Sequence, residues 1–244
     1  VVGTSLQHLD IFLFCHHKRR NMNPMNPEIN IKTGTMKTEI NQIYRMVDNW
    51  RKMAYPDQHQ DKDWSLEEIL ERQYHCLKEE VLELAEAYRQ NITIEIVDGI
   101  CDVIWVAMMM VSIGNSVYKD TDKEVNTPLS YTLNDGELSD LLTASLSFFI
   151  QYDNTLMSSD YGKSFSKGGA EGEYSKLLTD IISYGYGHLC QYGDRLRLFN
   201  EVIVSNYSKA VDGKLVLDDT NKVTKKAAID AGSYVKPDFT AYLK

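Results

Sequence analysis

A helix-like stretch between Ile94 and Val111 constrains this chain more than any other feature, because it is apolar on almost every side. A helix without a polar face is normally buried inside a fold. Three acids nevertheless share one stripe of it, since Glu95, Asp98 and Asp102 fall within about 60° of one another at roughly 100° per residue. Carboxylates are almost never fully buried without a partner. These acids therefore require a compensating group, and a hard cation suits clustered carboxylates best.

A second helix precedes the apolar one. Ser65 followed three residues later by Glu68 is a capping box, which marks the start of a helix. The apolar spacing extends this helix to about Arg89, and only the short link 90–93 separates it from the apolar helix. Two helices joined by so short a link are expected to lie antiparallel and adjacent.

The second helix carries acids that can face those of the apolar helix. Glu80 and Glu83 are three residues apart, share a helix face and border its apolar stripe. The antiparallel arrangement points this pair toward Asp98 and Asp102. Such an oxygen-rich cluster suits Mg²⁺ or Mn²⁺, with water filling the remaining positions. The alternative interpretation is a set of salt-bridged helix faces, with Lys78 or an arginine of the second helix as partner.

The remaining sequence is mostly helical in pattern. Apolar spacing predicts helices over residues 38–53, 138–152, 174–189 and 196–210, the third with interruptions at Gly185 and Gly187. Residues 1–35 are expected to form an irregular extension, with Met36 as a plausible start of the native protein. Residues 36–244 are expected to form a single all-α domain that ends in short turns or strands.

Composition and charge exclude several classes of partner. The formal net charge of −9 argues against a nucleic acid polymer as partner, because phosphate binding needs concentrated Lys and Arg. No membrane span is expected, since the longest apolar run, 103–113, is shorter than the ~20 residues that a spanning helix needs. The four cysteines are scattered without metal-ligand or disulfide spacing, which favours a reducing, cytoplasmic compartment.

Two blocks of residues, in order along the chain, carry a resemblance to a known family. The first block reads Glu79-Glu80-x-x-Glu83, then Glu95-x-x-Asp98 and Asp98-x-x-x-Asp102. The second reads Glu201-Val202-x-x-Ser205-Asn206-x-Ser208-Lys209, then Asp212-Gly213-Lys214, Lys222-x-x-Lys225 and Pro237-Asp238. Together they resemble the motifs of the all-α nucleoside triphosphate pyrophosphohydrolases, which include MazG-like proteins, dimeric dUTPases and phosphoribosyl-ATP pyrophosphohydrolase. The double-Asp form is similar to the phage-type, phosphoribosyl-ATP-pyrophosphohydrolase-like branch.

The resemblance implies a MazG-like helical bundle, with a helical insertion at about 115–195 because the two blocks lie farther apart than in compact members. It implies hydrolysis of a (deoxy)nucleoside triphosphate to the monophosphate and pyrophosphate with Mg²⁺, in nucleotide-pool control, by a homodimer or higher homo-oligomer. The metal ligands that it implies are Glu80, Glu83, Glu95, Asp98 and Asp102. The residues that would approach the substrate are Asn206, Lys209, Lys214, Lys222 and Lys225.

Several roles stay open at this point. Glu79, beside the ligands but turned outward, is the candidate general base or else a solvated helix acid. Trp105 can stack on a base, although an aromatic residue in an apolar helix more often belongs to the core. The alternative functions are the phosphoribosyl-ATP step of histidine biosynthesis and a catalytically silent helical module for oligomerisation or regulation.

Overall fold

The computed structural model describes residues 33–56, 64–117, 137–156 and 173–244 of the 244-residue chain. Within these ranges the chain forms seven α-helices and one 3₁₀ helix, with isolated β-bridges as its only strand-like pairing, so the predicted all-α class is confirmed. The helices are α1 (Met36–Ala54), α2 (Leu66–Gln90), α3 (Thr93–Val117), α4 (Leu138–Leu156), α6 (Glu173–His188), η3 (Leu189–Gln191), α7 (Arg195–Tyr207) and α8 (Lys226–Asp230).

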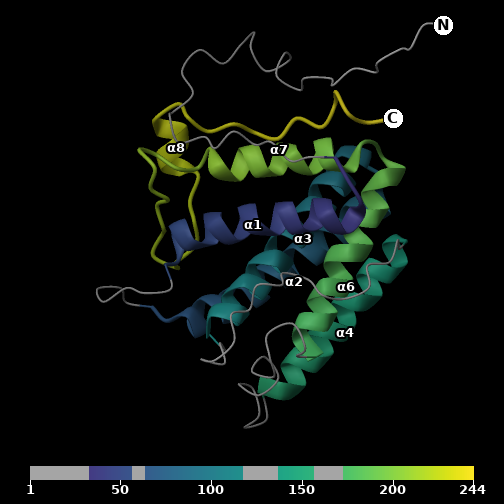
Figure 1. Cartoon of the computed structure of the whole chain (residues 1–244), viewed down its shortest axis with the longest axis horizontal. Coiled ribbons are helices and arrows are strands. Elements are labelled where there is room, and N and C mark those ends of the chain that lie inside the picture. The colour runs from purple at the N-terminus through teal and green to yellow at the C-terminus, as the bar shows by residue number, and fades with distance from the viewer. Residues whose placement is uncertain (1–32, 57–63, 118–136, 157–172) are drawn as a thin grey trace, which may run out of the picture.

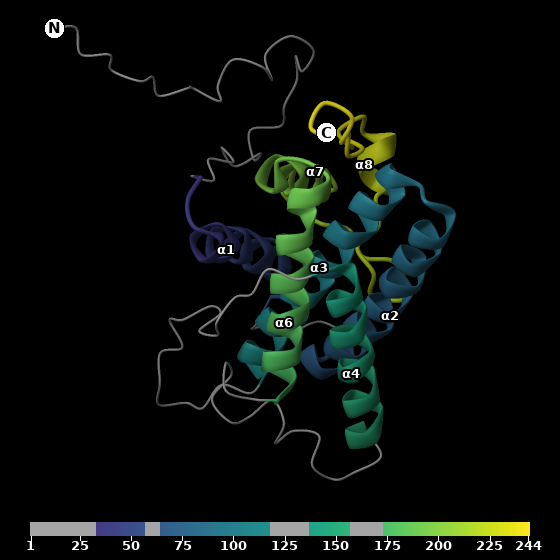
Figure 2. The same cartoon turned by 90° about the vertical axis from the view of Figure 1, so that its right-hand side faces the viewer.

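Helix α3 lies at the centre of the bundle, where α1, α2, α6 and α7 pack around it (Figures 1 and 2). From Ile100 to Ile113 every residue except Asp102 is buried, as the all-round apolar sequence predicted. By length and hydropathy alone the segment Thr93–Ser116 could cross a bilayer, but 89% of its most apolar window is buried inside the fold. A central core helix passes the same test, so this segment is weak evidence for a membrane protein.

The α2–α3 hairpin forms as predicted. The Ser65 hydroxyl accepts the backbone N–H of Glu68, and the Glu68 carboxylate accepts that of Ser65, which completes the capping box. The turn is made by Asn91, whose positive φ of 56° ends α2 in the left-handed conformation that asparagine tolerates. Only Asn91 and Ile92 separate the two helices, which are therefore packed side by side.

Two glycines allow close packing against the core helices. A Cβ at Gly99 of α3 would lie 3.1 Å from Cβ and 3.2 Å from Cα of Leu84 on α2. A Cβ at Gly185 of α6 would lie 3.0 Å from Cγ1 of Ile104 on α3. Helix α6 runs unbroken through Gly185 and Gly187, so the predicted interruptions there are wrong. The cost of glycine in a helix is offset by the tight α6–α3 contact that a side chain would prevent.

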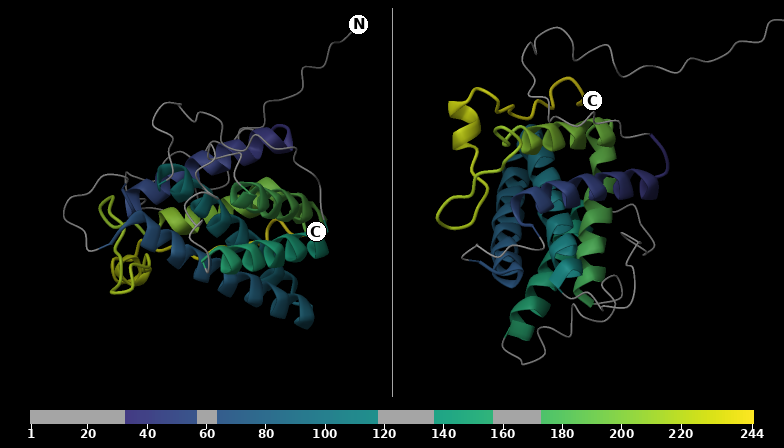
Figure 3. Two further views of the ribbon diagram at one scale, coloured as in Figure 1. Left: turned by 90° about the horizontal axis from the view of Figure 1, so that it is seen from below. Right: turned by 60° about the vertical axis from the view of Figure 1, so that its left-hand side comes forward.

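After α7 the chain turns back and runs along the same helix in the opposite direction (Figure 1, and the right panel of Figure 3). We call residues 211–244 the C-terminal strap. Hydrogen bonds fix its direction, because Val235 binds Ser208 near the end of α7 and Asp238 binds Glu201 in its middle. A β-bridge between Gly193 and Leu243 follows at the start of α7. The strap contains the short helix α8, where the sequence predicted only turns or strands.

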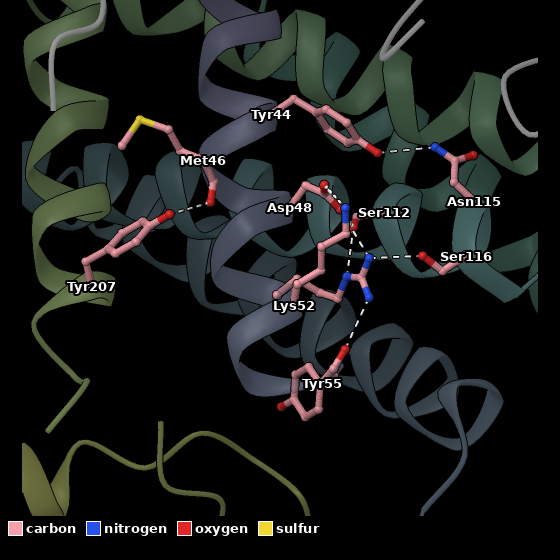
Figure 4. Close-up of polar contacts among 10 residues, drawn as sticks. Tyr44, Met46, Asp48, Lys52, Tyr55, Ser112, Asn115, Ser116 and Tyr207 are labelled. Atoms are coloured by element: carbon pink, nitrogen blue, oxygen red, sulfur yellow. Dashed lines mark hydrogen bonds and ion pairs between the residues drawn. The ribbon is translucent and has the colours of Figure 1, made fainter. Parts of the chain in front are cut away.

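A fully buried arginine joins α1 to the end of α3. The Arg51 guanidinium donates to the Asp48 carboxylate at 3.1 Å, to the hydroxyls of Ser112 and Ser116 at 2.9 Å, and to the Tyr55 carbonyl at 3.2 Å. Figure 4 shows the acceptors of this network. Burial by itself raises the pKa of Asp48, but Lys52, Ser112 and Arg51 outweigh it and hold that pKa below the ordinary 3.8.

The two glycines give a matched test of helix packing. Alanine is favoured over glycine by about 1 kcal/mol inside a helix at either position. A methyl at Gly99 meets the backbone of α2, whereas a methyl at Gly185 meets the Ile104 side chain, which can change its rotamer. Gly99→Ala is therefore expected to lower the melting temperature relative to Gly185→Ala. Equal melting temperatures for the two variants would contradict this packing.

The Asp48 network predicts a pH-dependent stability. The pKa of the Asp48 carboxyl is lower in the folded state than its ordinary value of 3.8. The ionised carboxylate therefore contributes its whole stabilisation at pH values above 3.8. This contribution is lost as the pH falls through the lower pKa of the folded state. Asp48→Asn is expected to cost about 2 kcal/mol at pH 7. In urea unfolding the difference from the unmodified protein should shrink below pH 3.8, while Asp219→Asn, at an exposed position, should change little at either pH.

Candidate functional site

The predicted acids lie on the facing sides of α2 and α3. Glu80, Asp98 and Asp102 are half-buried, whereas Glu83 and Glu95 are exposed at the rim. The Gly99–Leu84 contact brings the two helices together at this point, because Gly99 follows Asp98 and Leu84 follows Glu83. The same glycine that tightens the hairpin therefore brings α2 and α3 close together beside these acids.

These acids act on one another through their charges. Burial raises the pKa of Asp102 well above its ordinary value, and the charges of Asp98, Glu80 and Glu83 raise it further. Burial also raises the pKa of Asp98, to which Glu95 and Glu83 add. For Glu80, burial followed by the charge of Glu83 raises the pKa to about 7. The charges of all five predicted acids therefore enter these pKa shifts, while their role as metal ligands stays a prediction.

Three lysines predicted from the second sequence block interact through their charges with these acids or with one another. Lys209, just after α7, is half-buried and donates to the Asn206 side-chain oxygen at 2.7 Å. Burial lowers the pKa of Lys209, while Asp102 and Glu80 act in the opposite direction. Lys222 of the strap lowers the pKa of Glu80 against the larger effect of burial. Lys225 and Lys222 add positive charge that opposes protonation of Lys209 and so lowers its pKa.

Two further lysines differ in their described interactions. Lys214 is exposed, and its described contacts are the backbone hydrogen bonds and β-bridge with Val211. Lys236, which was not predicted, opposes the effect of burial on the pKa of Asp98. It stands directly before the Pro237-Asp238 pair of the second block, and this position was the only signal that could have found it.

Two further predicted residues have clear positions. Glu79 is exposed on α2 next to the half-buried Glu80, so its role as general base stays a prediction. Trp105 is 4% exposed and packs edge-on against Trp50, with ring centroids 5.4 Å apart. The Trp50 indole N–H in turn donates to the Asn206 carbonyl at 2.9 Å. Trp105 therefore belongs to the core beneath the site, and the base-stacking alternative has no support.

The donor set fits a hard divalent cation in its chemistry. It consists of carboxylates alone. Within the described ranges the side chains of Glu80, Glu83, Asp98 and Asp102 form no hydrogen bond or ion pair with another residue. As folded, however, no three His, Cys, Asp or Glu side chains in the described ranges are grouped closely enough to hold a metal ion. Side chains on facing helices would have to rotate toward a common point to share one.

Comparisons with protein-family models, curated proteins and solved structures find no match for this chain. The function proposed below therefore rests on the two sequence blocks and on the geometry that brings them together.

Removing one central charge distinguishes functional acids from structural ones. Because burial and neighbouring acids disfavour ionised Asp102, Asp102→Asn is expected to stabilise the protein in EDTA. The melting temperature should rise by about 2–4 °C for each kcal/mol of repulsion relieved. The control is Glu86→Gln on the same helix pair, since Glu86 is exposed and paired with Arg89. A lower melting temperature for Asp102→Asn would assign this acid a structural role.

Proposed function

We propose that this protein is a Mg²⁺-dependent nucleoside triphosphate pyrophosphohydrolase, which cleaves between the α and β phosphates to give a nucleoside monophosphate and pyrophosphate. One observation supports the proposal above all others. Acids of the α2–α3 hairpin and lysines far along the sequence influence one another's pKa values at a single place. Negative ligands for a cation and positive partners for phosphate are what a metal–triphosphate substrate needs.

The acids are proposed to have two roles, metal binding and general-base catalysis. Glu80, Glu83, Asp98 and Asp102 would hold the ion, with Glu95 at the rim as a further ligand. When bound, Mg²⁺ supplies neutralisation of phosphate charge and orientation of a water for in-line attack. Glu79 is proposed as the base for that water, because it lies beside Glu80 and is open to the solvent that delivers water.

The lysines are proposed to bind the phosphate groups of the substrate. Lys209 is held by Asn206 and presents its ammonium group to the acid cluster from the end of α7. Lys222 and Lys225 extend this positive charge along the strap. An ammonium group is a compact charge that binds phosphate oxygens. A protein of net charge −9 is thereby able to bind a small polyanion locally while it repels long ones.

The activity is expected to depend on the buried acids and on the metal. Purified protein with Mg²⁺ should release pyrophosphate from at least one nucleoside or deoxynucleoside triphosphate, and EDTA should abolish the release. Groups around a metal site typically cost 10- to 100-fold when removed, so Asp98→Asn should lower turnover by about 100-fold or more. Far-UV circular dichroism should remain helical, and the control Glu86→Gln should keep its activity.

The products separate the competing functions. Release of orthophosphate instead of pyrophosphate would place the reaction in another class. Preference for phosphoribosyl-ATP over all common nucleotides would favour the histidine-biosynthetic alternative. If no triphosphate in such a panel is hydrolysed and Mg²⁺ leaves the melting temperature unchanged, a silent helical module is the better explanation.

A further inference from the structure

The end of helix α7 is attached to α1 by two side-chain hydrogen bonds. The Trp50 indole N–H donates to the Asn206 carbonyl at 2.9 Å, and the Tyr207 hydroxyl donates to the Met46 carbonyl at 2.8 Å. Figure 4 shows the second of these bonds. Carbonyl groups in the last turn of a helix have no partner within the helix, and a buried indole N–H needs an acceptor. The Trp50–Asn206 bond meets both requirements.

Asn206 in turn holds Lys209 through two bonds. Its carbonyl also accepts the Lys209 backbone N–H at 3.2 Å, and its side-chain oxygen accepts the Lys209 ammonium group at 2.7 Å. Asn206 is only 6% exposed, whereas Lys209 is half-buried. Both oxygens of Asn206 are therefore used inside the protein, and little of its surface remains for a ligand. An ammonium group has three N–H donors, so two remain for another acceptor after the bond to Asn206.

Trp50 connects this arrangement to the helix that carries the acids. Its ring packs edge-on against Trp105 of α3, with the ring centroids 5.4 Å apart. Trp105 lies three residues after Asp102, nearly one helical turn along α3. One tryptophan thus contacts both the acid-bearing helix and Asn206. Packed and hydrogen-bonded groups therefore hold the Lys209 ammonium group, which would otherwise move with a flexible four-carbon chain.

We propose that Asn206 is a positioning residue, which the Trp50 indole fixes and which orients the Lys209 ammonium group for a phosphate without touching the substrate itself. The resemblance to the pyrophosphohydrolases implied that Asn206 approaches the substrate, so this inference assigns it a different role. It rests on the proposed function for the identity of the ligand. A lysine that is already held in its binding orientation loses less rotamer freedom when it binds an anion.

Acetylation of lysines by a water-soluble N-hydroxysuccinimide ester tests the Asn206–Lys209 contact in the full chain without any nucleotide. The rate at each lysine is measured by peptide mass spectrometry. Loss of a charge-assisted hydrogen bond should speed the acetylation of Lys209 about tenfold in Asn206→Ala. Asn206→Asp, which keeps an oxygen acceptor, should restore the slow rate. Lys244, whose ammonium group donates to the Cys190 carbonyl at 2.7 Å, is the internal control and should react at an unchanged rate.

Two conservative variants separate positioning from stability. Trp50→Phe removes the N–H that Asn206 accepts, and Tyr207→Phe removes the hydroxyl that donates to Met46, so each variant loses one bond between α1 and α7. Both should lower the melting temperature, but only Trp50→Phe should speed the acetylation of Lys209. Equal acetylation rates in these two variants would show that only the attachment of α7 matters and would overturn the role of Asn206.

The affinity for inorganic tripolyphosphate shows whether Asn206 contacts the ligand. Binding is measured by calorimetry with Mg²⁺ for Asn206→Ala, Lys209→Met and the double variant. If Asn206 acts through Lys209, the double variant binds as weakly as Lys209→Met, because the lysine that Asn206 orients is already lost. Additive losses would show that Asn206 contacts the phosphates and would overturn the proposal. Asn200→Ala, on the same helix, is the control and should retain the affinity of the unmodified protein.

These outcomes are separate from those of the hydrolysis assay. Faster acetylation of Lys209 in Asn206→Ala supports the positioning role even when no nucleotide is cleaved. An unchanged acetylation rate contradicts that role even when pyrophosphate is released. Failure of the unmodified protein to bind tripolyphosphate would overturn phosphate as the ligand of Lys209.

Discussion

Burial of α3 on all sides is the constraint on which the rest of the fold depends. An apolar helix of this length can be removed from water only if several partners cover it, and α1, α2, α6 and α7 do so. Three of these partners are held in place by identifiable contacts. A turn at Asn91 holds α2, the close approach at Gly185 allows α6 to pack, and the Arg51 network holds α1. The positions of the surrounding helices thus follow from the need to enclose one element.

The acid stripe of α3 opposes that burial. Asp98 and Asp102 interrupt an otherwise continuous apolar surface, and their surroundings favour the neutral form of both side chains. A fold selected for stability alone would place apolar residues here, because replacing buried charge by well-packed apolar groups is often stabilising. Two acids whose neutral form is favoured beside an apolar core helix are typical of a functional site, and they support the proposed function.

Local patterns predicted most of the architecture and the position of the acids on two adjacent helices. The capping box at Ser65, the short link before α3 and the helical spacing of the acids all depend on neighbours in the sequence, so single-sequence reasoning could find them. Tertiary contacts explain what was missed. Gly185 lies in a helix where Ile104 of α3 packs closely against it, and the strap runs back along α7 because Ser208 and Glu201 bind its backbone. Nothing local in the sequence distinguishes Arg51 as a buried residue.

The two halves of the site differ in how the chain assembles them. The acidic half belongs to one hairpin of adjacent helices, whose contacts are short-range in sequence and can form early in folding. Most of the lysines come from a distant segment that is attached to α7 by hydrogen bonds. This segment buries Phe239 and Ala228 and packs further apolar side chains partly against the core, namely Leu215, Leu217, Val223, Tyr242 and Leu243. Substitutions of its exposed lysines, Lys222, Lys225 and Lys236, are expected to disturb the core very little. Mutation of these lysines can change the charge around the acids of the α2–α3 hairpin while the apolar core remains as it is.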